Sequence, residues 1–133
     1  MESDLRRAVS TAYYALFHGL AACCADELFN RNMRNQPGWV RIYRGLNHRR
    51  AREACLVRGD MRSFTIEIRD FASCFVSMQH QRHRADYDPG ATFYKSDVRR
   101  LVIDSRAVLE EFERADRRER RSFAALVLFR GRS

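Results

Sequence analysis

The strongest constraint on this chain is a helical stripe of large apolar residues in the middle of the sequence that ends in two charges. The stripe consists of Phe64, Ile68, Phe71, Phe75 and Met78. Steps of four and three residues are typical of one buried face of an α-helix. Continued by the same steps, the stripe reaches Arg82 and Asp86. The following Asp88-Pro89-Gly90 ends the helix, because proline lacks a donor N–H.

The charged end of this helix has two interpretations that the residues leave open. In the first, Arg82 reaches a ligand. In the second, Arg82 and Asp86 only form an i,i+4 ion pair, which contributes about 0.2–0.5 kcal/mol when it is exposed. His80 and His83 lie nearby, and imidazole titrates near neutrality. Together with Asp86 they lack a recognised metal-ligand spacing, so we expect no metal and no cofactor.

The whole chain reads as an all-α protein. The periodicity predicts helices over residues 3–29, about 39–56 and 63 to about 87, a fourth that begins near residue 96, and a buried helix over 122–129. For this last run a strand stays an alternative. Polar segments at 30–38 and 88–94 read as loops, and residues 57–60 read as a turn. The predicted N-caps are Ser3 or Asp4, Ser63, and Ser96 or Asp97.

The first helix carries a second line of residues opposite its apolar stripe. The line consists of Arg7, Thr11, Tyr14 and His18. A helix with two such faces packs on both sides, either at the centre of a bundle or against another subunit. His18 reads either as a catalytic group or, more simply, as a histidine held by an internal hydrogen bond.

Charge and length narrow the class of protein. The 133 residues predict one domain over 1–133, and the net charge of +8 comes almost entirely from arginine, with Lys95 as the only lysine. Arginine suits phosphate and stacks on bases, so an RNA or nucleotide partner is expected. A GC-rich genome would give the same arginine bias without any ligand. Around Asn47-His48 we favour a solvated basic face over a polar site.

The cysteines and the hydropathy point to a cytoplasmic protein without a membrane segment. Cys23, Cys24, Cys55 and Cys74 show no C-x-x-C spacing, so we interpret them as reduced core residues. No apolar run approaches the ~20 residues that a bilayer requires. The N-terminus also lacks the basic and then apolar layout of a signal peptide.

Two stretches resemble the HEPN-domain superfamily. Residues 5–18 read LRRAVSTAYYALFH and resemble the opening helix of HEPN proteins. Residues 82–87 read RHRADY and are similar to the R-x-x-A-D-Y end of the third helix in one prokaryotic branch. The resemblance implies an up-and-down bundle of four to five helices, commonly a homodimer. It also implies a role in defence or toxin–antitoxin systems, often beside a nucleotidyltransferase partner, and in many members metal-independent endoribonuclease activity.

The family's nuclease signature is an arginine and a following histidine with four to six residues between them. Here the first histidine after Arg82 is the adjacent His83, and the spacing from Arg41 to His48 occurs on a different helix. Whether the chain is an enzyme therefore stays open, with a non-catalytic regulatory module as the alternative. The candidates for catalysis are Arg82, His83 and His80. The candidates for ligand binding are Arg84, Asp86, Tyr87, Arg7, Tyr14 and His18.

Overall fold

A computed structural model describes residues 1–129, so the last four residues of the expected domain lie outside it. Every regular element in this range is helical, which confirms the all-α prediction. In chain order the elements are α1 (Glu2–Phe29), η1 (Arg31–Met33), α2 (Pro37–Gly45), α3 (His48–Cys55), α4 (Arg58–Arg62), α5 (Ile66–Tyr87), α6 (Lys95–Arg114) and α7 (Arg117–Phe129).

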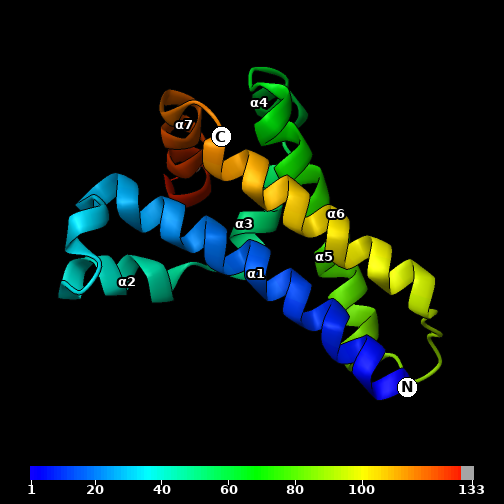
Figure 1. Ribbon diagram of the computed structural model, residues 1–133. Helices are drawn as coiled ribbons and strands as arrows, with labels where there is room; N and C mark the ends of the chain where they lie inside the picture. Colours follow the sequence, from blue (N-terminus) through cyan, green and yellow to red (C-terminus); the bar gives the residue numbers. More distant parts are fainter. Residues whose placement is uncertain (130–133) are drawn as a thin grey trace.

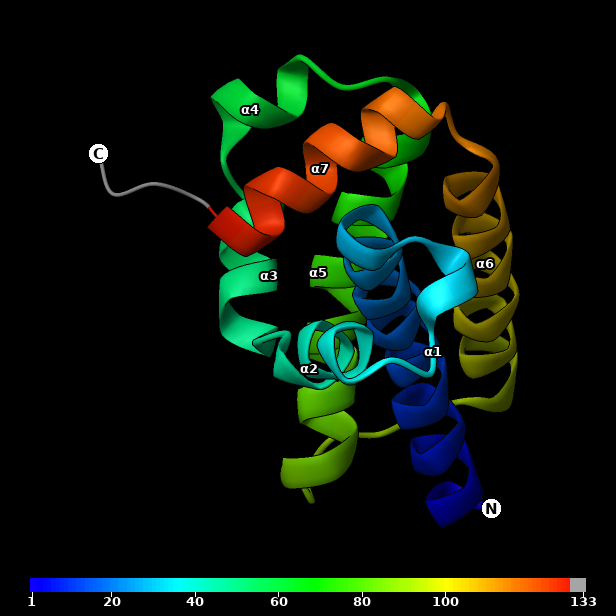
Figure 2. The same cartoon turned by 90° about the vertical axis from the view of Figure 1, so that its left-hand side faces the viewer.

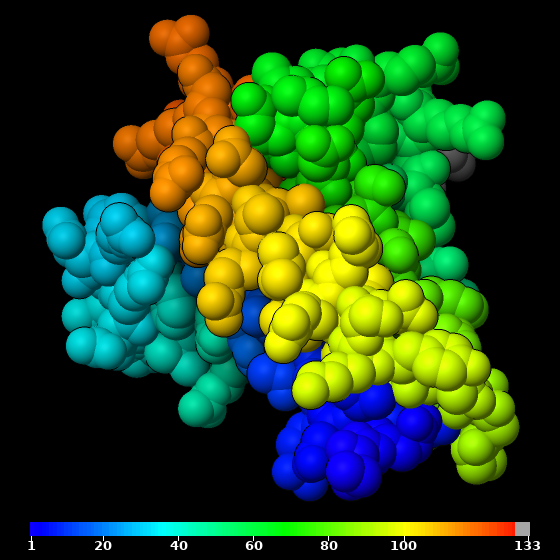
Figure 3. Space-filling model, turned by 45° about the vertical axis from the view of Figure 1, so that its right-hand side comes forward, coloured from blue at the N-terminus to red at the C-terminus, as the bar shows by residue number. Residues whose placement is uncertain are grey.

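The three long helices form the body of the bundle (Figure 1). α1 and α6 run in the same direction, and α5 runs against both of them. α7 crosses one end of the bundle, while α2 and α3 flank α1 and α5 (Figure 2). α1 contacts α2, α5, α6 and α7, so it is the central helix of the bundle. The second line of Arg7, Thr11, Tyr14 and His18, from which packing on both sides was expected, is exposed. In Figure 3, α6 covers much of α1, whose atoms show mainly near the N-terminus.

The predicted apolar stripe of α5 lies in the core. Ile68, Phe71 and Phe75 have no exposed surface, and the ring of Phe71 stacks on Phe112 of α6 with 4.1 Å between centroids. Gly19 allows α6 to approach α1 closely, because a Cβ at this position would lie 2.5 Å from Leu109 Cδ1. The core therefore joins the three long helices directly.

The predicted helix over 39–56 is wrong, because the structure has two helices there. α2 ends at Gly45, and Leu46 is extended with ψ of 128°. Asn47 then caps α3 by accepting a hydrogen bond from the backbone N–H of Arg50. The side-chain amide thus starts a second helix, which an apolar period cannot reveal.

The predicted N-caps are also wrong. Met1, Thr65 and Tyr94 occupy the N-cap positions of α1, α5 and α6, and none of them makes a side-chain capping bond. The expected turn over 57–60 continues into the short helix α4. The final apolar run is helical, and α7 already begins in the charged segment at Arg117. Helix boundaries depend on local backbone geometry more than on periodicity.

The four cysteines are free thiols, as predicted. Cys23, Cys24 and Cys55 are buried, and Cys74 is half-buried. Contrary to the expectation from the sequence, α1 is long and apolar enough to cross a membrane by length and composition alone. Half of its apolar window is buried inside the structure.

Candidate functional site

The inward face of the last turns of α5 carries the predicted charged pair. Gln79, Arg82 and Asp86 are spaced at i, i+3 and i+7, so they share one face of the helix. The Arg82 guanidinium lies over the rings of Tyr13 and Tyr14 of α1, 5.1 and 5.7 Å from their centroids. Its Nη1 lies 3.6 Å from Asp86 Oδ2, and the Arg82 side chain is 14% exposed. The predicted pair is therefore present, and the two tyrosines hold the arginine.

Arg82 keeps hydrogen-bonding capacity that the described residues do not use. Its Nε is buried without a partner among residues 1–129. A buried donor without a partner costs about 1–3 kcal/mol of stability. An atom of this kind next to a surface is typical of a position that a ligand or a water completes.

A histidine from α3 joins this arginine. The Tyr13 hydroxyl lies 2.7 Å from His48 Nδ1, and Gln79 Nε2 lies 3.3 Å from the same hydroxyl. Gln79 Nε2 also donates to the His48 carbonyl oxygen at 3.4 Å, which fixes the orientation of the amide. Since the Tyr13 oxygen accepts from Gln79, it donates its own proton to His48 Nδ1. A neutral His48 therefore carries its proton on Nε2.

The electrostatics keep His48 neutral. Burial, the Arg82 charge and His18 together lower the pKa of His48 below its usual range. Burial also raises the pKa of Tyr13 to about 12, so its hydroxyl remains a donor at neutral pH. His48 Nε2 has no partner and is not buried among the described residues. It therefore offers an N–H to solvent beside Arg82.

A second histidine lies on the outer side of Tyr14. The His18 ring is 6.1 Å and the His48 ring 5.9 Å from the Tyr14 ring. His18 Nδ1 is 3.1 Å from the Tyr43 hydroxyl of α2, and His18 is exposed. We call the group of Tyr13, Tyr14, His18, His48 and Arg82 the histidine–arginine cluster.

Of the predicted site residues, Arg82, Tyr14 and His18 meet in this cluster, and Asp86 lies at its edge, where it accepts a hydrogen bond from Ser10. His80, His83 and Tyr87 share a different face of α5 and are exposed. The His83 ring packs on Tyr87, with 5.0 Å between centroids. Sequence proximity to Arg82 therefore does not bring these side chains into the cluster.

Two predicted arginines lie elsewhere. Arg84 donates to Gln81 Oε1 at 2.8 Å, and its guanidinium lies 5.1 Å from the Phe93 ring centroid. Arg7 is exposed and lines a groove of about 440 Å³ between α1 and α6. Neither position adjoins His48 in the contacts that the structure shows.

Arg6 holds the end of α5 in place. Its guanidinium donates to four backbone carbonyls, those of Arg84, Ala85, Asp88 and Ala91. The carbonyls of Arg84 and Asp88 also accept from backbone N–H groups, so those of Ala85 and Ala91 are the ones that would otherwise need water. Arg6 thereby fixes the position of Arg82 and Asp86 relative to α1.

Sequence reasoning missed His48, Tyr13, Tyr43 and Gln79. Tyr13 reads as part of the apolar stripe, and His48 reads as part of a basic helix face. One signal was available, because Asn47 is a good N-cap residue and would place His48 at a helix start. The contact between Tyr13 and His48 joins residues 35 positions apart, which no local pattern can predict.

Comparison with known proteins adds no family assignment: no family model, no curated protein and no solved structure matches this chain. Among residues 1–129, no group of three or more His, Cys, Asp or Glu side chains could hold a metal ion. What the described cluster can supply is a guanidinium, an imidazole N–H and aromatic faces, which together suit a phosphate with an attached base.

Proposed function

We propose that this chain binds single-stranded RNA through the histidine–arginine cluster. The observation that carries the proposal is the Arg82 guanidinium, held over two tyrosine rings beside a neutral His48 that points an N–H outward. Arginine and an imidazole N–H donate to phosphate oxygens, and exposed aromatic rings stack on unpaired bases. The net charge of +8 adds long-range attraction for a polyanion.

The cluster also has two of the three groups that metal-free RNA cleavage requires, a base and a cation. Such cleavage needs a base for the 2′-hydroxyl, an acid for the leaving oxygen and a cation for the charge on phosphorus. Because Tyr13 occupies its Nδ1, the neutral His48 donates a hydrogen bond from Nε2 to a phosphate oxygen, and the leaving oxygen takes its proton from water. His18 is exposed and is therefore the better placed histidine for accepting the 2′-hydroxyl proton. Arg82 supplies the cation.

The resemblance to HEPN-domain proteins supports a proposal for the oligomeric state, the partner and the cellular system of this chain. It suggests a cytoplasmic homodimer in a defence or toxin–antitoxin system, with a small nucleotidyltransferase as partner. Sedimentation at micromolar concentration tests the dimer, and a monomer at that concentration would contradict a site shared by two subunits.

RNA binding by matched variants tests the proposal. Arg82→Gln and Arg84→Gln remove the same charge from the same helix, two residues apart. We expect Arg82→Gln to weaken binding of a fluorescent single-stranded RNA about tenfold or more, and Arg84→Gln to weaken it by less than about threefold. Affinity should also fall steeply with salt, because each phosphate contact on a single strand releases about 0.7 counterion. Equal losses in the two variants would contradict the proposal.

A regulatory module without RNA chemistry is the second candidate. Asp86 favours it, since this carboxylate pairs with Arg82 and also accepts from Ser10, which ties α5 to α1 within one chain. In that case Arg82→Gln lowers the melting temperature and RNA does not bind at low salt. A pull-down with a neighbouring nucleotidyltransferase then becomes the informative experiment.

A further inference from the structure

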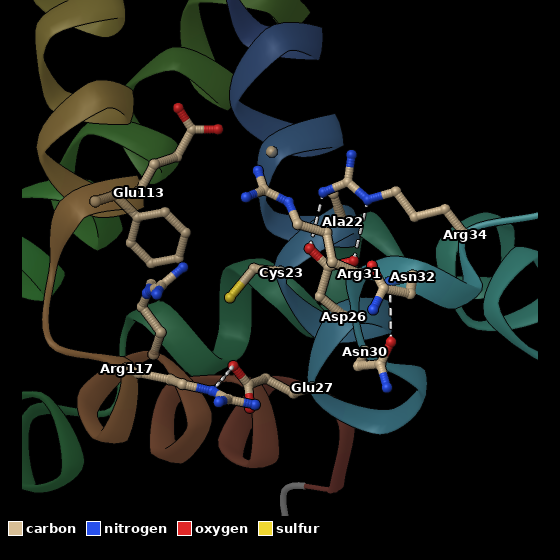
Figure 4. A pocket seen from close by; sticks show the side chains of 13 residues that line it. Ala22, Cys23, Asp26, Glu27, Asn30, Arg31, Asn32, Arg34, Glu113 and Arg117 are labelled. Carbon is tan, nitrogen blue, oxygen red and sulfur yellow. Dashed lines mark hydrogen bonds and ion pairs between the residues drawn. The ribbon is translucent and has the colours of Figure 1, made fainter.

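A cavity at the other end of α1 carries charges that the histidine–arginine cluster does not use. The cavity has a volume of about 500 Å³, which falls in the range of small-molecule sites. Its walls come from the C-terminal half of α1, the η1 turn, the end of α6 and the start of α7 (Figure 4). Four arginines and three carboxylates line it.

Two of the carboxylates are already neutralised. Asp26 accepts from Arg34 Nη2 at 2.8 Å and from the Trp39 indole N–H at 2.9 Å. These bonds lower the pKa of Asp26 although burial opposes them. Glu27 is 11% exposed and lies within 4.0 Å of both Arg117 and Arg121. Of these two arginines only Arg117 lines the cavity, so Glu27 adds no net negative charge to this wall.

Two further arginines of the lining form no ion pair among the described residues. Arg31 also makes no side-chain hydrogen bond there, although its charge helps to lower the pKa of Asp26, and its side chain extends into the cavity region in Figure 4. Arg120 donates only to the Ala115 carbonyl, at 3.2 Å. Glu113 is the one lining carboxylate without an ion pair among residues 1–129. The four arginines of the lining therefore exceed its three carboxylates by one charge.

The lining of the cavity also includes small and apolar side chains. These are Ala22 and Cys23 of α1 and Phe112 of α6. Burial raises the pKa of the Cys23 thiol to about 12, so the sulfur adds no charge at neutral pH. A cavity lined by both guanidinium groups and apolar side chains suits a ligand with an anionic head and a compact apolar or planar part.

We propose that this cavity binds a small molecule that carries a phosphate group. Arginine forms paired, charge-assisted hydrogen bonds to phosphate oxygens, and its planar fork matches their geometry. Arg31 and Arg120 hold the phosphate, and Glu113 limits affinity by repulsion. The site is separate from the histidine–arginine cluster and does not depend on RNA binding there.

Calorimetric titration with inorganic pyrophosphate tests the site, and Arg118 offers a matched control. Arg31→Gln and Arg118→Gln remove equal charge, but Arg118 does not line the cavity. We expect saturable binding to the wild-type chain, about tenfold weaker binding to Arg31→Gln and less than about twofold change in Arg118→Gln. Glu113→Gln should bind more tightly, because it removes the repelling carboxylate.

Three results would overturn the proposal. The first is the absence of saturable binding, and the second is an equal loss in Arg31→Gln and Arg118→Gln, which would indicate only diffuse charge. The third is citrate binding as tightly as pyrophosphate, which would show no preference for phosphate. Arg82→Gln separates the two sites: it should retain pyrophosphate binding, and a loss there with full binding in Arg31→Gln would place the anion at the histidine–arginine cluster instead.

Discussion

The two faces of the last turns of α5 carry similar residues in different environments. The inner face presents Gln79 and Arg82 to α1 and α3, and Arg82 is 14% exposed. The outer face presents His80, His83 and Tyr87 to solvent, where Tyr87 is 65% exposed. Neighbouring residues on a helix point about 100° apart, so adjacent Arg82 and His83 belong to different surfaces.

This difference shows that the surroundings of a side chain in residues 82–87 depend on the helices it faces rather than on its place in the RHRADY motif. Arg82 acquires two aromatic rings and a neutral imidazole from α1 and α3. His83 acquires only the exposed ring of Tyr87. We therefore expect changes on the inner face to affect both stability and binding, and changes on the outer face to affect neither.

The largest effect is expected at Arg6, which fixes the position of both faces. Arg6→Ala removes four hydrogen bonds at the end of α5 and in the following loop. The carbonyls of Ala85 and Ala91 lose their donor, while those of Arg84 and Asp88 keep a backbone N–H. Hydrogen bonds to charged groups contribute about 1.5–3 kcal/mol each, and water replaces some of them, so unfolding free energy should fall by about 3 kcal/mol. Urea denaturation measures this change. The exposed neighbour Arg7 provides the control, and an equal loss in Arg7→Ala would contradict the role of Arg6.

A smaller effect is expected at Tyr13, which links the inner face to His48. Tyr13→Phe removes the hydroxyl that donates to His48 and accepts from Gln79, and this position has no exposed surface. Leaving a buried polar group unpaired costs about 1–3 kcal/mol. Tyr14→Phe serves as the control, since Tyr14 is 37% exposed and shows no hydrogen bond. Thermal unfolding of the two variants should differ by several degrees, and equal melting temperatures would refute the link.

The sequence predicted the core better than it predicted the site. The spacing from Phe64 to Met78 indicates the buried face of α5 correctly, because burial repeats with the helical period. Arg82 of the cluster and Asp86 at its edge could also be predicted, since both extend the same stripe. His48 was not, because its environment is created by Tyr13 and Gln79 from two other helices. A tertiary contact of this kind cannot be predicted from the local spacing of apolar residues.

A pH effect of moderate size on stability is expected from His48, which packs against the inner face. The pKa of His48 lies below its ordinary value of 6.5, so the unfolded chain binds more protons than the folded chain as the pH falls. His48 therefore contributes its full stability above about pH 6.5 and loses it at lower pH. Melting temperatures between about pH 7.5 and about pH 5.5 should fall less for His48→Gln than for the wild type. An identical fall in both proteins would show that His48 is not buried as described.

The smallest effect is expected on the outer face. His83→Ala removes a ring that touches only the exposed Tyr87. Surface substitutions of this kind change stability by less than about 0.5 kcal/mol. RNA affinity should also remain unchanged within the error of a fluorescence titration. A loss of affinity in His83→Ala would move the binding surface to the outer face and end the distinction between the two.

The most direct test follows all four histidines of the chain in one experiment. His18 and His48 belong to the cluster, and His80 and His83 belong to the outer face. Histidine-selective ¹⁵N NMR during titration with single-stranded RNA reports on each imidazole separately. We predict that the signals of His18 and His48 shift with RNA, while those of His80 and His83 stay in place. Shifts confined to His80 and His83 would contradict the assignment of the RNA site to the histidine–arginine cluster.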